Sequence, residues 1–171
     1  MGTVDTRTWM EYLSEAECWD LLAETQVGRL GVLVDSAPEI YPVNHMVDGH
    51  SIVFRTDPGT KLAGLAKSPA VCFEVDGVDP ERHKGWSVLV KGRAHELTDP
   101  DERHRVAERN LRYWSVGPKP HWIRIEAREV TGRRIHRSVD EVTDDTVDRD
   151  AADGDRAGAD AADRVPNREG L

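Results

Sequence analysis

The segment covering residues 40–66 constrains the fold most, because two strand patterns, a tight turn and a short helix follow one another in it. Residues 52–54 are an apolar run of strand-forming side chains, and the Asp48-Gly49 pair before them is a strong β-hairpin signal. Asp57-Pro58-Gly59 ends the second strand, and residues 60–66 have the apolar spacing of a short helix. A hairpin that leads directly into a short helix indicates an antiparallel sheet with small helical additions.

Polar side chains gather where the second strand of this hairpin passes into the helix. Arg55 and Thr56 end the strand, and Lys61 lies in the first helical turn. A guanidinium fork suits phosphate oxygens, and the N-terminus of a helix attracts anions. The sequence therefore predicts a phosphate-bearing ligand held by Arg55, Thr56 and Lys61, although solvated surface charges would give the same pattern. The chain has no G-x-x-x-x-G-K-[ST] loop and no G-x-G-x-x-G after a predicted strand, so an ordinary dinucleotide-binding fold is not supported.

The rest of the chain continues the pattern of short strands separated by turns. Ser14 and Glu17 match a helix capping box, and Pro100 suits the first turn of a charged helix capped by Thr98 or Asp99. Pro42 favours an edge or a bulge over the middle of a regular sheet. We expect about six strands in a largely antiparallel sheet that can close into a barrel, with strands at residues 28–34, 39–47, 52–56, 70–75, 86–97 and 121–135, and a polar loop at 76–85.

Charge divides the chain into two parts. The formal net charge is -9, of which residues 138–171 carry -7 (eleven acids against four arginines) and residues 1–137 only -2. The tail has almost no large apolar side chains, so we expect residues 1–137 to form one domain and residues 138–171 to be a disordered acidic tail. Neither part has the basic face of a nucleic-acid-binding protein.

Cysteine and histidine usage argues against disulfides and metal sites. Cys18 and Cys72 are far apart, and both are expected to be small buried residues in a reducing compartment. No C-x-x-C pair exists and the seven histidines lack metal-ligand spacing, so no metal site is predicted. Without a leader pattern or a run of 18 apolar residues, a cytoplasmic protein with no membrane segment is expected.

Several of these segments, in this order and spacing, resemble the pyridoxamine 5′-phosphate oxidase-like flavin-binding split barrels, most closely the branch with nitroimidazole-resistance-type and actinobacterial members. The resemblance covers roughly residues 13–137. It is carried by V-G-R-L-G at 27–31, Y-P-V-N-H at 41–45, F-R-T at 54–56, G-T-K at 59–61, V-C-F-E-V at 71–75 and W-S-V-x-V-x-G-R-A at 86–94. It implies a mainly β fold, a six-stranded antiparallel split barrel, that forms a homodimer with FMN or a related flavin in a groove at each dimer interface.

The resemblance also assigns roles to single positions. Arg55, Thr56 and Lys61 match contacts to the flavin phosphate and ribityl chain. His45 follows the strand under the ring and could stabilise a reduced flavin or donate a proton, since an unperturbed imidazole has a pKa of about 6.5. The other positions that the resemblance assigns to the cofactor are Pro42, Val43, Asn44, Trp86, Ser87, Trp122 and Arg124.

A flavin-dependent oxidoreductase follows as the expected function. The cofactor would carry hydride through its N5 atom to a small organic acceptor or to oxygen, so no catalytic triad is needed. The deazaflavin F420 also presents a phosphate beyond a tricyclic ring, so the sequence does not choose between it and FMN. The residues that bind pyridoxal phosphate in true oxidases cannot be located, so vitamin B6 metabolism is not supported.

Two alternatives stay open at this point. One is a binding or storage protein for flavin, F420 or haem, with His45 or His50 as an axial haem ligand. The other is a scaffold that has lost its ligand, in which the acidic tail is the working part.

Overall fold

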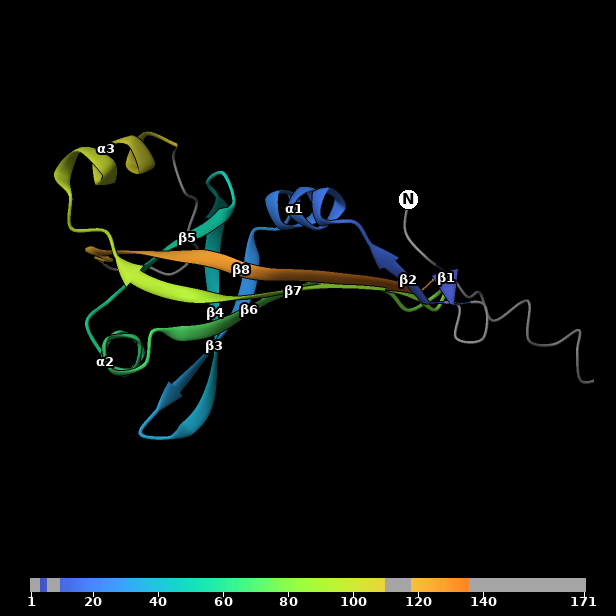
Figure 1. Cartoon of the computed structure of the whole chain (residues 1–171), viewed down its shortest axis with the longest axis horizontal. Helices are drawn as coiled ribbons and strands as arrows, with labels where there is room; N and C mark the ends of the chain where they lie inside the picture. Colours follow the sequence, from blue (N-terminus) through green and yellow to red (C-terminus); the bar gives the residue numbers. More distant parts are fainter. Residues whose placement is uncertain (1–3, 6–9, 110–117, 136–171) are drawn as a thin grey trace, which may run out of the picture. The chain divides into compact units, whose positions relative to one another are not determined.

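The structure is a computed structural model that describes residues 4–5, 10–109 and 118–135 (Figure 1). Three short helices accompany the strands of one sheet within these ranges. The strands are β1 (Val4–Asp5), β2 (Met10–Leu13), β3 (Val27–Val34), β4 (Ala37–Val47), β5 (Ser51–Thr56), β6 (Ala70–Asp79), β7 (Lys84–Glu96) and β8 (His121–Ile135), and the helices are α1 (Glu15–Glu24), α2 (Thr60–Lys67) and α3 (Pro100–Glu108).

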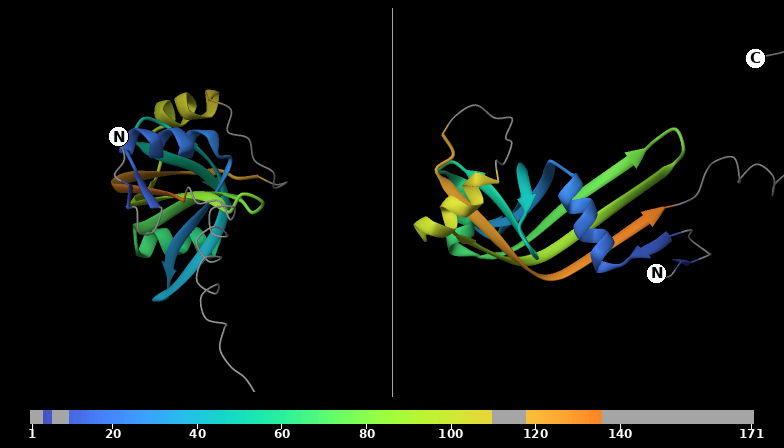
Figure 2. Two further views of the ribbon diagram at one scale, coloured as in Figure 1. Left: turned by 90° about the vertical axis from the view of Figure 1, so that its right-hand side faces the viewer. Right: turned by 90° about the horizontal axis from the view of Figure 1, so that it is seen from above.

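Six of the strands close into a ring. Their order is β8-β5-β4-β3-β6-β7, and β7 pairs again with β8, every pairing being antiparallel. The predicted mainly β fold, a six-stranded antiparallel barrel, is confirmed. β2 extends the sheet by pairing with the second half of β8, and β1 pairs with β2. Figure 2 shows the β6–β7 hairpin and β8 running on past the ring, with β2 alongside β8. These two N-terminal strands were not predicted, because two and four residues are too few to show an alternating pattern.

Side-chain alternation fills the inside of the ring. Val71, Phe73 and Val75 of β6 are buried, whereas Cys72 between them is exposed. The prediction that both cysteines are buried is thus right for Cys18 and wrong for Cys72, which lies on the outward face of its strand. The ring interior is completed by apolar side chains of the other strands and of α1, among them Leu22, Leu30, Ile52, Phe54, Val88, Val90, Ile123 and Ile125.

β5 is buried on both faces, which explains its uninterrupted apolar run. Ile52 and Phe54 belong to the main core, whereas Val53 packs in a second cluster with Leu97, Val106 and Trp122. Val106 comes from α3, so this second cluster fixes that helix against the outer face of β5 and β8. Figure 1 shows α1 and α3 on one side of the long β7 and β8 strands and α2 on the other.

Local sequence signals have their expected counterparts. Ser14 and Glu17 form the capping box of α1, and Asp99 caps α3 ahead of Pro100. Pro42 lies in the half of β4 that pairs with β3 alone, so its missing N–H interrupts no ladder with β5.

One boundary differs from the prediction. The expected polar loop at residues 76–85 is largely strand, because β6 and β7 stay paired as far as Asp79 and Lys84. Gly77 makes this pairing compact, since a Cβ there would lie 2.5 Å from Trp86 Nε1. α3 ends at Glu108. The predicted acidic tail, residues 138–171, lies outside the described residues, so that domain boundary stays a prediction.

Candidate functional site

A small hollow lies where β4, the end of β5, the start of α2 and the segment before β8 meet. We call it the anion pocket, and its volume is about 160 Å³. Its lining residues are Val27, Pro42, Val43, Asn44, Arg55, Lys61 and Lys119. Five of the residues assigned from the sequence are therefore brought together, and three cationic side chains line one small space.

Arg55 is held in place from two directions. Its Nε donates a 2.7 Å hydrogen bond to the backbone carbonyl of Lys119. Its guanidinium carbon lies 4.9 Å from the ring centroid of Trp122, a cation–π distance. Trp122 is the direct cross-strand partner of Arg55 in the β5–β8 pairing, so the two side chains share a face of the sheet. The guanidinium is thus oriented before any ligand arrives.

Lys61 reaches the pocket from the first turn of α2. Gly59 caps this helix without a side-chain hydrogen bond. The Lys61 ammonium lies 5.1 Å from the ring centroid of Tyr41. Burial lowers the pKa of Lys61, and the positive charge of Lys119 lowers it further, while Asp57 acts in the opposite direction. An anion beside this ammonium would relieve both unfavourable effects, so the electrostatics of the pocket favour a negatively charged ligand.

β4 supplies the uncharged side of the pocket through Pro42, Val43 and Asn44. The Asn44 Nδ2 atom donates a 3.3 Å hydrogen bond to the backbone carbonyl of Gln26. β3 lies next to β4 here, with Gly28 paired to Val43. β3 packs closely on the Phe73 side chain of β6, because a Cβ on Gly28 would lie 2.2 Å from Phe73 Cζ. Gly28 therefore marks a close approach between β3 and β6.

Thr56 and His45 do not line the anion pocket. Thr56 is buried, and its hydroxyl donates to the Asp57 carbonyl at 3.2 Å. His45 is buried between α1 and the core, with its Nε2 2.9 Å from the Leu22 carbonyl and its ring edge-on to Phe73 at 4.8 Å. Burial lowers the pKa of His45, which favours the neutral imidazole. These are the contacts of a core residue, and the proposed role of His45 at a flavin ring stays a prediction.

Trp86 and Ser87 lie elsewhere on the barrel. Trp86 lines a second hollow with Lys84 and Arg134, near the tip of the β6–β7 hairpin. Ser87 is half-buried within the β6–β7–β8 sheet, opposite Asp76 and Arg133. Within this chain the structure does not bring either residue to the anion pocket.

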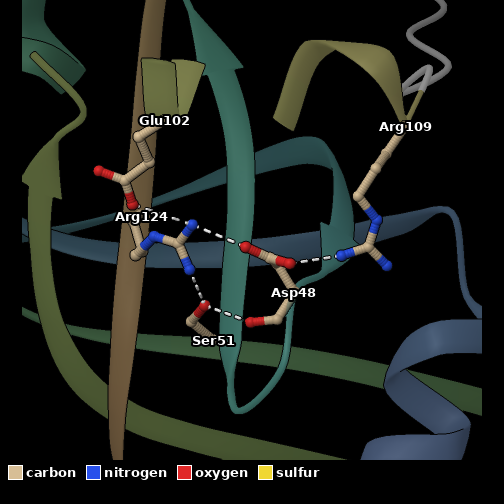
Figure 3. A network of polar contacts seen from close by, with 5 residues as sticks. All are labelled: Asp48, Ser51, Glu102, Arg109 and Arg124. Atoms are coloured by element: carbon tan, nitrogen blue, oxygen red, sulfur yellow. Dashed lines mark hydrogen bonds and ion pairs between the residues drawn. The ribbon is translucent and has the colours of Figure 1, made fainter. Parts of the chain in front are cut away.

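Arg124 is engaged in an ion network on the outer face of β8 (Figure 3). It donates to Ser51 Oγ at 2.5 Å and to Asp48 Oδ2 at 2.7 Å, and it lies 3.2 Å from Glu102 Oε1. Asp48 also pairs with Arg109. The network joins the tip of the β4–β5 hairpin to both ends of α3. Trp122 packs in the second cluster and Arg124 in this network, so within one chain both have structural partners.

Lys119 is the pocket residue that the sequence interpretation missed. It lies between Pro118 and Pro120, just before β8. The available signal was position, since the residue three places before Trp122 must pass the end of β5, where Arg55 lies.

Residues 14–134 match the family model of pyridoxamine 5′-phosphate oxidase. The chain belongs to this family. The Mycobacterium tuberculosis protein Rv0080 is 36% identical over 128 residues, which are 72% of this chain and 84% of that protein.

Solved structures of the pyridoxamine 5′-phosphate oxidase family share this barrel. A structure described as the FAD-binding protein from Mycobacterium smegmatis is 37% identical, with a TM-score of 0.63, and the match covers 73% of this chain and 98% of that one. A FAD-binding protein from Mesorhizobium loti is 27% identical, with a TM-score of 0.62 and coverage of 73% and 97%. The family and the split-barrel fold expected from the sequence motifs are confirmed.

Within the described ranges, no group of three or more His, Cys, Asp or Glu side chains could hold a metal ion. In the same part of the chain, no helix combines the length and apolar character needed to cross a membrane.

Proposed function

We propose that this protein binds a flavin by its phosphate end in the anion pocket and acts as a flavin-dependent oxidoreductase. The observation that carries the proposal is the convergence of Arg55, Lys61 and Lys119 on one hollow of about 160 Å³. Family membership and the two FAD-binding relatives support a flavin over other phosphate-bearing ligands. FMN is the simplest such ligand, with FAD and F420 as alternatives.

The residues present fit one end of a flavin and not the whole molecule. Complete small-molecule sites occupy roughly 300–1,000 Å³. The anion pocket is smaller, and its cationic lining suits a phosphate group. The Asn44 amide and the backbone of Pro42 and Val43 lie on the β4 side, where they could bond the polar edge of a ring. The rest of the flavin ring must be covered by protein surfaces outside the anion pocket.

We further propose that a second copy of the chain supplies that cover, in a homodimer. Between β3, β4, β6 and β7 lies an open hollow of about 770 Å³, which we call the apolar hollow. Its lining includes Leu33, Ile40, Cys72 and Leu89, and Ile40 is 71% exposed in the single chain. Apolar patches of this kind are typical of interaction surfaces.

A bound flavin supplies hydride transfer through its N5 atom, and the protein's part is to bind, orient and shield. Arg55 and Lys61 neutralise the phosphate charge, and the fixed geometry of Arg55 sets where that end of the ligand sits. The substrate class expected is a small organic acceptor or oxygen.

The test of cofactor and activity is spectroscopic. We expect purified protein reconstituted with FMN to retain a flavin absorption spectrum after gel filtration, and the bound flavin to be bleached by a nicotinamide or another reductant under anaerobic conditions. Retained flavin that no reductant bleaches would support a storage protein instead. Protein that retains no flavin would contradict the proposal.

Two matched variants test the dimer. Ile40→Glu places a charge in the apolar hollow, whereas Val78→Glu places one at a valine that is 72% exposed outside it. We expect Ile40→Glu to shift the protein towards the monomer in sedimentation velocity and to weaken flavin binding, and Val78→Glu to do neither. An unaltered protein that sediments as a monomer would exclude the homodimer.

A further inference from the structure

Lys119 is carried by a short strap, Pro118-Lys119-Pro120, that is fixed on both sides. Arg55 Nε donates to the Lys119 carbonyl at 2.7 Å, and Arg103 of α3 donates to the Pro120 carbonyl at 3.3 Å. The flanking prolines restrict the backbone further by fixing φ. A lysine on such a strap keeps its place more firmly than one on an ordinary surface loop.

α3 also supports the strap indirectly, through the second cluster. Val106 of α3 packs with Trp122, which follows the strap by two residues and lies against the Arg55 guanidinium. The ion pairs of Arg124 with Glu102 and of Arg109 with Asp48 hold both ends of the same helix (Figure 3). The position of Lys119 is therefore built into the packing of α3.

Among the described residues, four charged side chains lie in or beside the pocket. Arg55, Lys61 and Lys119 are three positive charges on the lining. Asp57 is the carboxylate that acts on Lys61, so the sum is about two positive charges. A phosphomonoester carries close to two negative charges near pH 7, whereas a phosphodiester carries one.

We infer that Lys119 is a specificity-determining residue that makes the anion pocket select a doubly charged phosphomonoester, as in FMN, over a singly charged phosphodiester. This inference rests on the proposed function, because it names which flavin phosphate the same pocket takes. Lys119 acts by direct charge pairing with the ligand, and its backbone carbonyl sets the direction of Arg55.

The experiment compares two flavins that share one ring and differ in phosphate charge. FMN and riboflavin 4′,5′-cyclic phosphate are titrated into the full-length protein, with binding followed by flavin fluorescence. We expect FMN to bind roughly 10-fold more tightly than the cyclic compound, the size of one charge-assisted hydrogen bond. Lys119→Met should bring the two affinities close together, mainly by weakening FMN.

Lys67→Met is the matched control, because Lys67 lies at the far end of α2 and pairs with Asp35 outside the pocket. It removes the same charge and should leave the ratio of the two affinities unchanged. If Lys119→Met keeps the ratio of the unaltered protein, or Lys67→Met lowers it equally, the inference is wrong while flavin binding stands.

Failure of the proposed function gives a different result. If the unaltered protein binds neither flavin, the flavin proposal falls, and inorganic pyrophosphate and phosphate become the probes. A rise in melting temperature with either anion that Lys119→Met lowers and Lys67→Met does not would still support the role of Lys119. No rise in the unaltered protein would overturn it.

Discussion

The Nε atom of Arg55 donates a hydrogen bond to the backbone carbonyl of Lys119 at 2.7 Å. This contact joins the end of β5 to the segment before β8 across 64 residues of sequence. Lys119 therefore contributes to the anion pocket in two ways. Its backbone carbonyl orients Arg55, and its side chain brings a third positive charge. The pocket is thus preorganised by the barrel.

Arg55→Lys tests this preorganisation, because it keeps the charge and removes both the Nε bond and the planar fork. We expect FMN affinity to fall roughly 10-fold, with little change in stability towards urea. Arg93→Lys is the control, since Arg93 is an exposed arginine of β7 outside the pocket. Equal FMN affinity in Arg55→Lys and the unaltered protein would mean that charge alone matters.

Trp122 has two roles that substitutions can separate. Trp122→Ala removes a ring packed with Val53, Leu97 and Val106, and we expect it to cost about 3–5 kcal/mol of unfolding free energy. Trp122→Phe keeps most of that packing but weakens the cation–π contact with Arg55, so FMN affinity should fall about 2- to 5-fold. Chemical denaturation and FMN titration measure the two effects. A Phe variant that matches the unaltered protein in FMN affinity would leave Trp122 with a packing role only.

Much of this arrangement follows from the sequence, and the rest depends on long-range packing. The hairpin, the capping box and the grouping of Arg55 with Lys61 rest on local signals. The structure forms the hairpin and the capping box and brings these two side chains to one pocket, whereas an anion there stays a prediction. Lys119 could not be found in this way, because its place beside Arg55 depends on the β5–β8 register. The same limit applies to β1 and β2, which are strands only because β8 continues past the ring and offers an edge.

The contacts of His45 within one chain follow from strand geometry. The resemblance assigns it to the flavin ring, which stays a prediction, and neighbouring residues of a strand face opposite sides. Asn44 lines the pocket, and the His45 side chain points into the core, where it contacts the Leu22 carbonyl and the Phe73 ring.

Asp48→Asn tests the ion network below α3. Asp48 accepts from Arg124 at 2.7 Å and also pairs with Arg109, so the variant should lose about 1–2 kcal/mol of stability at pH 7. Asp79→Asn is the control, because Asp79 pairs with the nearby Arg82 at an exposed hairpin and should cost less than about 1 kcal/mol.

The same network gives a pH dependence. The hydrogen bond from Arg124 is the main cause that lowers the pKa of Asp48 in the folded protein. The unfolded carboxyl, with a pKa of about 3.9, then binds a proton more readily, so this stabilisation is complete above about pH 5 and is lost as the pH falls below about 4. The stability gap between Asp48→Asn and the unaltered protein should therefore narrow from pH 7 to pH 3. A constant gap would mean that the carboxylate charge contributes nothing.

His45 predicts a second pH effect in a different window. Burial lowers its pKa, so the unfolded chain takes up a proton below about pH 6.5 that the folded protein resists. Stability should fall as the pH drops from 6.5 towards 5, by at most about 1.4 kcal/mol per pH unit from this residue. His45→Gln keeps a donor for the Leu22 carbonyl and cannot titrate, so its stability should fall less steeply. Equal slopes for the two proteins would show that His45 is protonated in the fold.

The most direct test of flavin binding through the phosphate compares FMN with riboflavin, which has the same ring and no phosphate. Both are titrated into the unaltered protein and into the double variant Arg55→Gln, Lys61→Met, with circular dichroism to confirm that the variant is folded. We predict that the unaltered protein prefers FMN to riboflavin by at least about 10-fold and that the variant loses this preference. Equal affinity for FMN and riboflavin in the unaltered protein, or no binding of either, would contradict the account.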